Sequence, residues 1–321
     1  EWAPWRPGTS HLMKPIHFLV LGSLLPSAAP VAAGCTESAA ISVQVLGSGG
    51  PEWGDGRASS GYLVWRGDEA VVMVDAGSGS ALNFERSGAD LTDLKAVLFT
   101  HFHVDHSVDF PSLVKASYFT GRRANLPVYG PSGNALMPSA SGFMAMSLGE
   151  SGAYRYLSGY LADGAQESYR IEVTDVPLAP EAVHRFDIDA NIRVSAVPVH
   201  HGPLPAIAWR VDIDGCSISF SGDMSNRYRT LEKLARGSDL LVAHNAVPAG
   251  ATGAARSLHM PPAEIGQVAS KAGVGMLVLS HRMQRTLGRE RETEAAIRNH
   301  FSGPLAFADD LDRFAVDSNR D

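Results

Sequence analysis

The stretch His101-Phe-His103-Val-Asp105-His106 places four potential metal ligands within six residues. It directly follows the apolar run 96–100, which predicts a buried strand. Side chains two residues apart in an extended segment point the same way, so His101 and His103 can bind one ion. Asp105 and His106 can turn toward a second ion. Only 12 of the 321 residues are histidine, and three of these lie in the hexapeptide, which argues against chance clustering.

Three further candidate ligands stand at the ends of apolar strands in the same way. Residues 197–199 lead into His200-His201-Gly202, residues 217–221 into Gly222-Asp223, and residues 277–280 into His281. Polar groups at strand ends can meet at one edge of a sheet. Together with the hexapeptide they suit two ions such as zinc, with manganese or iron as alternatives. Because His200 and His201 alternate along the strand, only one of them can face the metals.

Apolar runs and turn residues predict alternating strands and helices on both sides of the hexapeptide. Strands are expected at 41–46, 61–65, 70–75, 192–199, 206–213, 216–221, 239–243 and 276–279, and helices at 80–87, 229–235 and 262–272. Residues 113–187 are less regular and are expected to form an inserted, lid-like segment. The alternation predicts an α/β protein of two similar layers, with residues 35–321 forming a single domain.

The composition is that of an ordinary globular protein, with 45% hydrophobic and 19% charged residues. The formal net charge of -7 argues against a protein whose main task is to bind nucleic acid, although a local basic patch is compatible with it. Nucleic acid is therefore not the expected partner. Because a pair of bound metal ions can activate water for attack on a carbonyl, phosphorus or sulfur atom, the expected substrate is a small-molecule ester.

The N-terminal 34 residues have the pattern of an export signal. Met13-Lys14 begins a cationic region, residues 16–25 are apolar but too short to span a bilayer, and small residues follow up to Cys35. The pattern predicts cleavage near Ala33 or Gly34 and a periplasmic or secreted protein, with residues 1–12 upstream of the signal. Gly34-Cys35 is also similar to a lipoprotein cleavage site, although Ala32 stands where leucine is usual.

A membrane is an expected partner only if Cys35 is lipidated. If Cys35 is lipidated or cleaved away, Cys216 has no disulfide partner. Cys216 is then expected to be a buried small hydrophobic residue, and two cysteines alone indicate no disulfide framework.

The ordered series HxHxDH, His-Gly, Ser-Gly-Asp and Leu-Ser-His resembles the metallo-β-lactamase superfamily over residues 41–310. The resemblance implies a four-layer αββα sandwich with a dinuclear site between two sheets. It assigns His101, His103 and His201 to the first ion. It assigns Asp105, His106 and His281 to the second, with Asp223 bridging the two. In related sequences the histidine directly before glycine is usually the ligand, which favours His201 over His200.

Within that superfamily the chain is similar to the ribonuclease Z-like and arylsulfatase-like branch. True metallo-β-lactamases lack a bridging aspartate such as Asp223, and residues 119–123, 128–134 and 258–264 also resemble this branch. In ribonuclease Z proteins a His-Glu pair and a later histidine assist proton transfer. Here the pair is His244-Asn245 and the later histidine is His259, so the missing glutamate counts against a tRNA-processing relay. The candidate catalytic residues are Asp105, His244 and His259.

The resulting prediction is an exported dinuclear zinc hydrolase that attacks an aryl sulfate, a phosphodiester or a carboxylic ester. A hydroxide bridging two zinc ions would be the nucleophile, because coordination lowers the pKa of water to about 7. Asp105 would accept a hydrogen bond from it. Hydrolysis of a β-lactam or lactone, iron-dependent oxygenation of a sulfur compound, and a non-catalytic binding module are the alternatives. The substrate and the oligomeric state stay open, although the resemblance is compatible with a homodimer.

Overall fold

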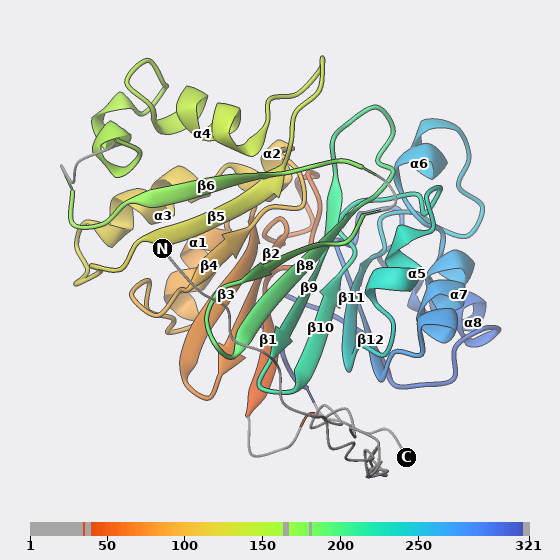
Figure 1. The fold of residues 1–321 in the computed structure, drawn as a ribbon. Coiled ribbons are helices and arrows are strands. Elements are labelled where there is room, and N and C mark those ends of the chain that lie inside the picture. Colours follow the sequence, from red (N-terminus) through yellow and green to blue (C-terminus); the bar gives the residue numbers. More distant parts are fainter. Residues whose placement is uncertain (1–34, 36–39, 163–166, 180–181, 317–321) are drawn as a thin grey trace, which may run out of the picture. The chain divides into compact units, whose positions relative to one another are not determined.

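The computed structural model describes residues 35, 40–162, 167–179 and 182–316, all of which belong to one compact unit, Ala33–Asp321. The predicted export signal lies outside these residues. Two seven-stranded sheets form the centre of the unit, and helices cover their outer faces (Figure 1). Among the residues described, no helix is long and apolar enough to cross a membrane.

The first sheet begins with an antiparallel part and ends with a parallel part. Its order is β14 (Arg313–Ala315), β1 (Ile41–Gly47), β2 (Gly61–Arg66), β3 (Glu69–Ala76), β4 (Ala96–Leu98), β5 (Leu126–Pro131) and β6 (Ile171–Val176). Strands β3 to β6 run parallel. All residues of β3 except the first are buried, which agrees with an apolar strand covered on both faces.

The second sheet has the same size and the same division. Its order is β13 (Leu305–Phe307), β12 (Met276–Ser280), β11 (Leu240–His244), β10 (Cys216–Phe220), β9 (Ile207–Ile213), β8 (Ile192–Pro198) and β7 (His184–Asp187). Strands β10 to β13 run parallel, and β7 to β10 pair antiparallel. The carboxyl ends of the parallel strands therefore meet at one edge of the sheet.

Three apolar clusters hold the layers together. The central cluster combines residues of both sheets, such as Val72 on β3 and Trp209 on β9. The first sheet packs against α1 (Ser80–Arg86), α3 (Phe110–Ser117), α4 (Ala140–Leu148) and the 3-10 helix η2 (Arg155–Tyr160). The second packs against α5 (Thr230–Leu234), α7 (Pro262–Ala272) and α8 (Glu290–Arg298). This arrangement confirms the predicted four-layer αββα sandwich.

The segment 113–187, expected as a lid-like insertion, is partly built into both sheets. It contributes β5 and β6 to the first sheet and β7 to the second, while α4 and η2 pack on the outer core of the first sheet. Pro127, Gly130 and Pro131 lie within β5, and residues of this kind usually indicate a turn, so pattern analysis did not detect the strand. A lid function for the remainder of the segment stays a prediction.

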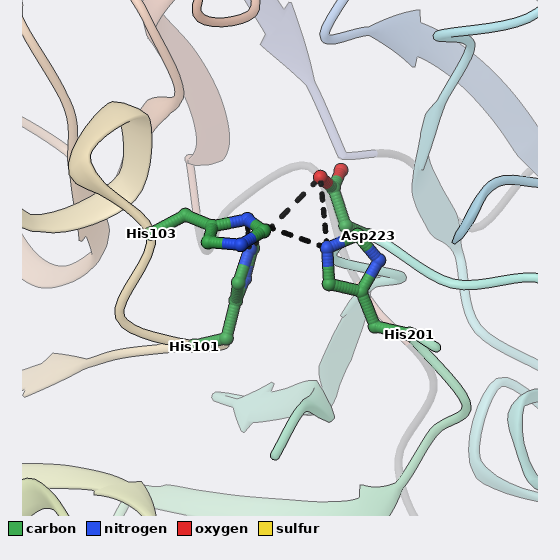
Figure 2. A group of neighbouring side chains, drawn as sticks. All are labelled: His101, His103, His201 and Asp223. Carbon is green, nitrogen blue, oxygen red and sulfur yellow. Dashed lines mark hydrogen bonds and ion pairs between the residues drawn. The ribbon is translucent and has the colours of Figure 1, made fainter. Parts of the chain in front are cut away.

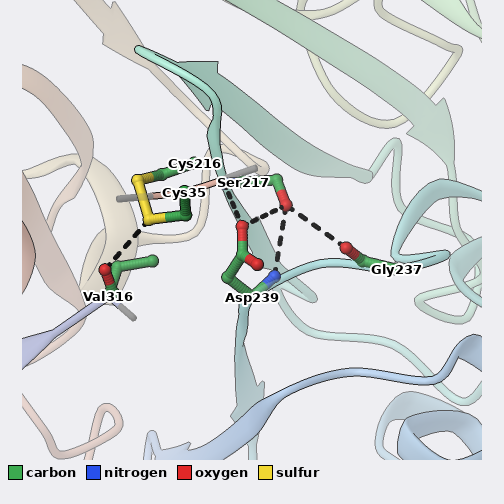
Figure 3. The surroundings of a disulfide bond; sticks show 6 residues. All are labelled: Cys35, Cys216, Ser217, Gly237, Asp239 and Val316. Atoms are coloured by element: carbon green, nitrogen blue, oxygen red, sulfur yellow. Dashed lines mark hydrogen bonds between the residues drawn. A yellow bond between two sulfur atoms is a disulfide. The ribbon is translucent and has the colours of Figure 1, made fainter. Parts of the chain in front are cut away.

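The two cysteines form a disulfide bond, contrary to the expectation that Cys216 has no partner (Figure 3). Cys35 and Cys216 are separated by 181 residues, and both are buried in the core between the sheets. The Sγ atom of Cys35 also lies 3.1 Å from the carbonyl oxygen of Val316. The pairing depends on a long-range tertiary contact, so no spacing rule could have revealed it. The bond attaches the residue that follows the predicted export signal to the first residue of β10.

The disulfide is expected to contribute measurably to stability. Cys35→Ser and Cys216→Ser should each lower the free energy of unfolding by about 2–5 kcal/mol, because the bond closes a long loop in the unfolded chain. Denaturant unfolding without reductant measures the loss. Addition of reductant should weaken the wild-type protein to the level of the variants and leave the variants unchanged. Equal stability of all three proteins under oxidising conditions would contradict a formed bond.

Candidate metal centre

The predicted ligands come together where strands from both sheets end. His101 follows β4, His201 follows β8, Asp223 follows β10, and His281 follows β12. The hexapeptide then turns into α2 (Val104–Ser107), whose first turn carries Asp105 and His106. The first sheet thus supplies one half of the site and the second sheet the other.

A first group of ligand atoms comprises His101, His103, His201 and Asp223 (Figure 2). The Nδ1 atom of His103 lies 3.0 Å from Nε2 of His101 and 3.4 Å from Nε2 of His201. Two nitrogens that each bind a tetrahedral zinc ion at 2.0–2.1 Å would lie about 3.4 Å apart. The spacing of the three imidazoles therefore suits a shared ion.

A second group comprises His106, Asp223, His244 and His281. The Nε2 atom of His281 lies 3.4 Å from Oδ1 of Asp223. Asp105 borders this group, with its Oδ2 atom 3.6 Å from Nε2 of His106 and 3.9 Å from Nε2 of His281. Asp223 belongs to both groups, which is the position that a bridging ligand needs.

Within the second group, His244 is the histidine whose two ring nitrogens both have hydrogen-bond partners. Nδ1 lies 2.8 Å from Oδ1 of Asp223, and Nε2 lies 2.9 Å from the hydroxyl oxygen of Tyr62. Among the described residues, the Oδ2 atom of Asp105 lies near the imidazoles of His106 and His281 and accepts no hydrogen bond. This difference favours Asp105 over His244 as a donor to the second ion.

Polar groups behind the site orient the imidazoles. Nδ1 of His106 donates to Oδ2 of Asp75 at 2.7 Å, and Nδ1 of His201 donates to the carbonyl oxygen of Leu258 at 3.0 Å. Nδ1 of His281 lies 2.8 Å from Oγ of Ser60. In each ring Nε2 is left to face the centre, as is usual for histidines that bind metals.

Asp75 was missed in the sequence although it shows the same pattern as the other site residues. It stands near the end of the apolar strand β3, and its carboxylate accepts hydrogen bonds from the backbone N–H and the hydroxyl of Thr100, both at 2.7 Å. A search for every acidic residue at a strand end would have found it. Ser60 and Tyr62 carried no comparable signal, because Tyr62 lies within an ordinary strand and Ser60 directly precedes that strand.

The electrostatics of the site favour a bound cation. Burial by itself would lower the pKa of His106, but the carboxylates of Asp105 and Asp75 raise it well above the usual value. Burial also opposes ionisation of Asp223. His281, His259 and the hydrogen bond from His244 nevertheless hold the pKa of Asp223 well below its usual range. Positive charge is therefore stabilised between these carboxylates.

The remaining imidazoles are suited to donate a lone pair. Burial lowers the pKa of His101 and His281 well below the usual value and lowers that of His201 as well. Neutral imidazole is the form that binds metals. Within the part of the chain that the structure describes, Nε2 of His106 is buried and has no hydrogen-bond partner. The residues present thus fit two divalent cations.

Backbone conformation explains the glycine of the Ser-Gly-Asp motif. Gly222 has a φ angle of 57°, and a Cβ atom there would lie 2.9 Å from Cβ of Thr100. Both constraints exclude a larger residue directly before Asp223. His281 itself has a φ angle of 53°, and such strain is found most often at functional sites.

The structure also separates His200 from His201. His201 faces Asp223, with Nε2 3.8 Å from Oδ2, whereas Nδ1 of His200 lies 2.7 Å from Oγ of Ser225. The ring of His200 packs edge-on against Tyr228. His259 also faces Asp223, with its Nδ1 atom 3.7 Å from Oδ1 of the carboxylate. Burial lowers the pKa of His259 to about 4.

A fold of this kind with a centre of this composition defines a metal-dependent hydrolase. The family model described as "Beta-lactamase superfamily domain" matches residues 71–282. This chain therefore belongs to the metallo-β-lactamase superfamily, in its ribonuclease Z-like branch. Members of the superfamily bind divalent metal ions, typically zinc.

Known proteins resemble the chain along most of its length. Ribonuclease Z of Mycobacterium bovis (strain BCG / Pasteur 1173P2) is 28% identical over 299 residues, which cover 87% of this chain and 100% of the relative. Human tRNase Z, short form, has the same fold, with a TM-score of 0.64, 18% identity, and coverage of 86% of this chain and 99% of that one. Zinc-bound PqqB from Methylobacterium extorquens also shares the fold, with a TM-score of 0.59, 14% identity, and coverage of 85% and 99%.

These relatives correct one expectation. The exclusion of nucleic acid as a partner is wrong, because ribonucleases match nearly the whole chain. The error came from the net charge of -7, which averages over the entire surface. Metal ions in a site supply positive charge locally, so an acidic chain can still meet a phosphate there.

Separate substitution of the adjacent histidines His200 and His201 by alanine is the sharpest test of the ligand assignment. His201→Ala should lose about one of two zinc ions per chain, because it removes a donor of the first group. His200→Ala, the matched control on the neighbouring residue, should retain both ions because its ring contacts Ser225 and Tyr228 instead. Metal content after dialysis measures the difference. Retention of both ions by His201→Ala would exclude His201 as a ligand.

Proposed function

We propose that this chain is a metal-dependent phosphodiesterase that hydrolyses RNA. The observation that carries the proposal is that Asp223 belongs to both ligand groups. Two metal ions that share a ligand are suited to phosphodiester hydrolysis, because they can stabilise both the attacking and the leaving oxygen. The similarity to ribonuclease Z over 87% of the chain supports RNA as the source of the phosphodiester. Two zinc ions bound here would provide a nucleophilic water at neutral pH and neutralise charge on the phosphoryl oxygens.

The seven ligands of the proposal are those predicted from the sequence. His101, His103 and His201 would hold the first ion, and Asp105, His106 and His281 would hold the second. Asp223 belongs to both ligand groups and would be shared between the ions. Asp105 has a further role, because its carboxylate borders the second group and can accept a hydrogen bond from the attacking water. The hydrogen bond would orient the water toward phosphorus.

His259 is placed to interact with the leaving oxygen. Its Nδ1 atom is buried, has no hydrogen-bond partner among the residues described, and lies 3.7 Å from Oδ1 of Asp223. Asn245, which follows His244 in the sequence, cannot take up or release a proton as a glutamate can, so His259 would act without a glutamate from that pair. His244 is less suited to proton transfer, because both of its nitrogens are already engaged.

A cation beside the site agrees with an anionic substrate. Arg285 is exposed, its Nε atom donates to the carbonyl oxygen of Ala246 at 2.6 Å, and its charge is one of the smaller influences on the pKa of His259. A guanidinium in this position can bind a phosphate next to the cleaved bond. A neutral substrate such as a lactone would gain nothing from it.

Hydrolysis of a panel of substrates by zinc-loaded protein tests the proposal. Labelled single-stranded RNA and RNA with a 3′ extension should be cleaved, and Asp105→Asn should reduce the rate at least 100-fold. DNA of the same sequence, a bis-aryl phosphate, an aryl sulfate, an aryl ester, a lactone and a chromogenic β-lactam complete the panel. If the protein cleaved the bis-aryl phosphate but not RNA, the assignment as a phosphodiesterase would stand and RNA would be excluded as its substrate. Cleavage of only an aryl sulfate or a β-lactam would reject both.

We further propose that the chain is exported. The pattern of residues 13–34 supports export, and so does the buried Cys35–Cys216 bond, because stable disulfides are typical of oxidising compartments. A sulfur atom in a disulfide cannot also carry a thioether-linked lipid, which favours a form without a lipid anchor. The mass of the mature N-terminus in a periplasmic or secreted fraction tests this. A start at residue 34 or 35 is expected, whereas an uncut chain in the cytoplasm would contradict export.

A further inference from the structure

A polar contact joins the two sheets next to the metal centre. Tyr62 lies on β2 of the first sheet and is fully buried in the core between the sheets. Its hydroxyl donates to Oγ of Ser280 on β12 at 3.0 Å and lies 2.9 Å from Nε2 of His244 on β11. A tyrosine of one sheet thus fixes a histidine of the other.

His244 passes this constraint to the bridging carboxylate. Its Nδ1 atom, on the opposite side of the ring from Nε2, lies 2.8 Å from Oδ1 of Asp223. The ring also stacks on His281, with centroids 4.7 Å apart and an interplanar angle of 8°. The hydrogen-bond contacts of both ring nitrogens and the stacking on His281 together fix the orientation of the His244 imidazole.

The orientation of Asp223 decides how the two groups share its carboxylate. Oδ1 faces His244 and His281, at 2.8 Å and 3.4 Å, and lies 3.7 Å from Nδ1 of His259. Oδ2 faces His106 and His201, at 3.7 Å and 3.8 Å. The terminal torsion of an aspartate is broad, so an external contact must select one setting. The hydrogen bond from His244 provides that contact.

We propose that Tyr62 is a positioning residue of the metal centre, acting through His244 to set the two oxygens of Asp223. The proposal concerns metal binding by the chain and does not depend on RNA being the substrate. The hydrogen-bond partners of the Tyr62 hydroxyl, His244 and Ser280, both border the site, since Ser280 directly precedes His281. Removal of the hydroxyl should therefore lower the affinity of the site for metal.

Tyr62→Phe tests the proposal, because it keeps the ring and removes only the hydroxyl. Competition with a chromophoric chelator should show that at least one of the two zinc ions binds 10–100-fold more weakly, the usual effect of losing a group that orients a ligand. The matched control is Tyr169→Phe. That residue is also buried, with its hydroxyl 2.7 Å from Oγ of Ser117, but it belongs to the outer core of the first sheet. It should leave both affinities unchanged.

A double-mutant cycle shows whether the effect passes through His244. His244→Ala alone should weaken zinc binding to a similar extent, and addition of Tyr62→Phe should then cause no further loss. Wild-type affinity in Tyr62→Phe, or an undiminished effect of this substitution in the His244→Ala background, would overturn the proposal. If Tyr62→Phe does not fold, wild-type affinity in His244→Ala would overturn it equally. A failure to cleave RNA would leave the zinc titrations unaffected, so the two proposals are tested separately.

Discussion

The buried carboxylate of Asp223 is the constraint around which the site is organised. Its side chain is only 4% exposed and is surrounded by imidazoles from both sheets. An isolated buried charge is costly, and hydrogen bonds and neighbouring positive charge must offset that cost. Asp223 can therefore be accommodated only if both sheets are packed in the correct register. The site and the fold depend on the same contacts.

The two-sheet architecture also explains how the site can be held rigidly at the boundary between strands and loops. Ligands stand at strand ends, where regular hydrogen bonding stops and loops begin, while the groups that orient them lie on the strands behind. Asp75 on β3 and Tyr62 on β2 are examples of such supporting residues. A phosphodiester needs a preorganised positive site more than it needs a large cavity, because catalysis depends chiefly on neutralising developing charge.

Much of the fold could be predicted because strongly apolar strands dominate it. The strands expected near residues 41–46, 70–75 and 216–221 are observed as β1, β3 and β10. The strands β13 and β14 were missed, because three-residue strands at the sheet edges carry too little pattern to be recognised. The strand β5 was missed for a different reason, since its prolines and glycine indicate a turn when considered locally.

By itself the sequence determined which residue types are available to bind metal and where along the chain they stand. Short-range spacing was enough for this, because strand periodicity and the position of His101 to His106 after an apolar run are local properties. Only the tertiary structure decided that His201 and not His200 faces Asp223, that Cys35 pairs with Cys216, and that Tyr62 contacts His244. Those contacts join segments far apart in the chain, and their geometry is fixed by the packing of two sheets rather than by any local pattern.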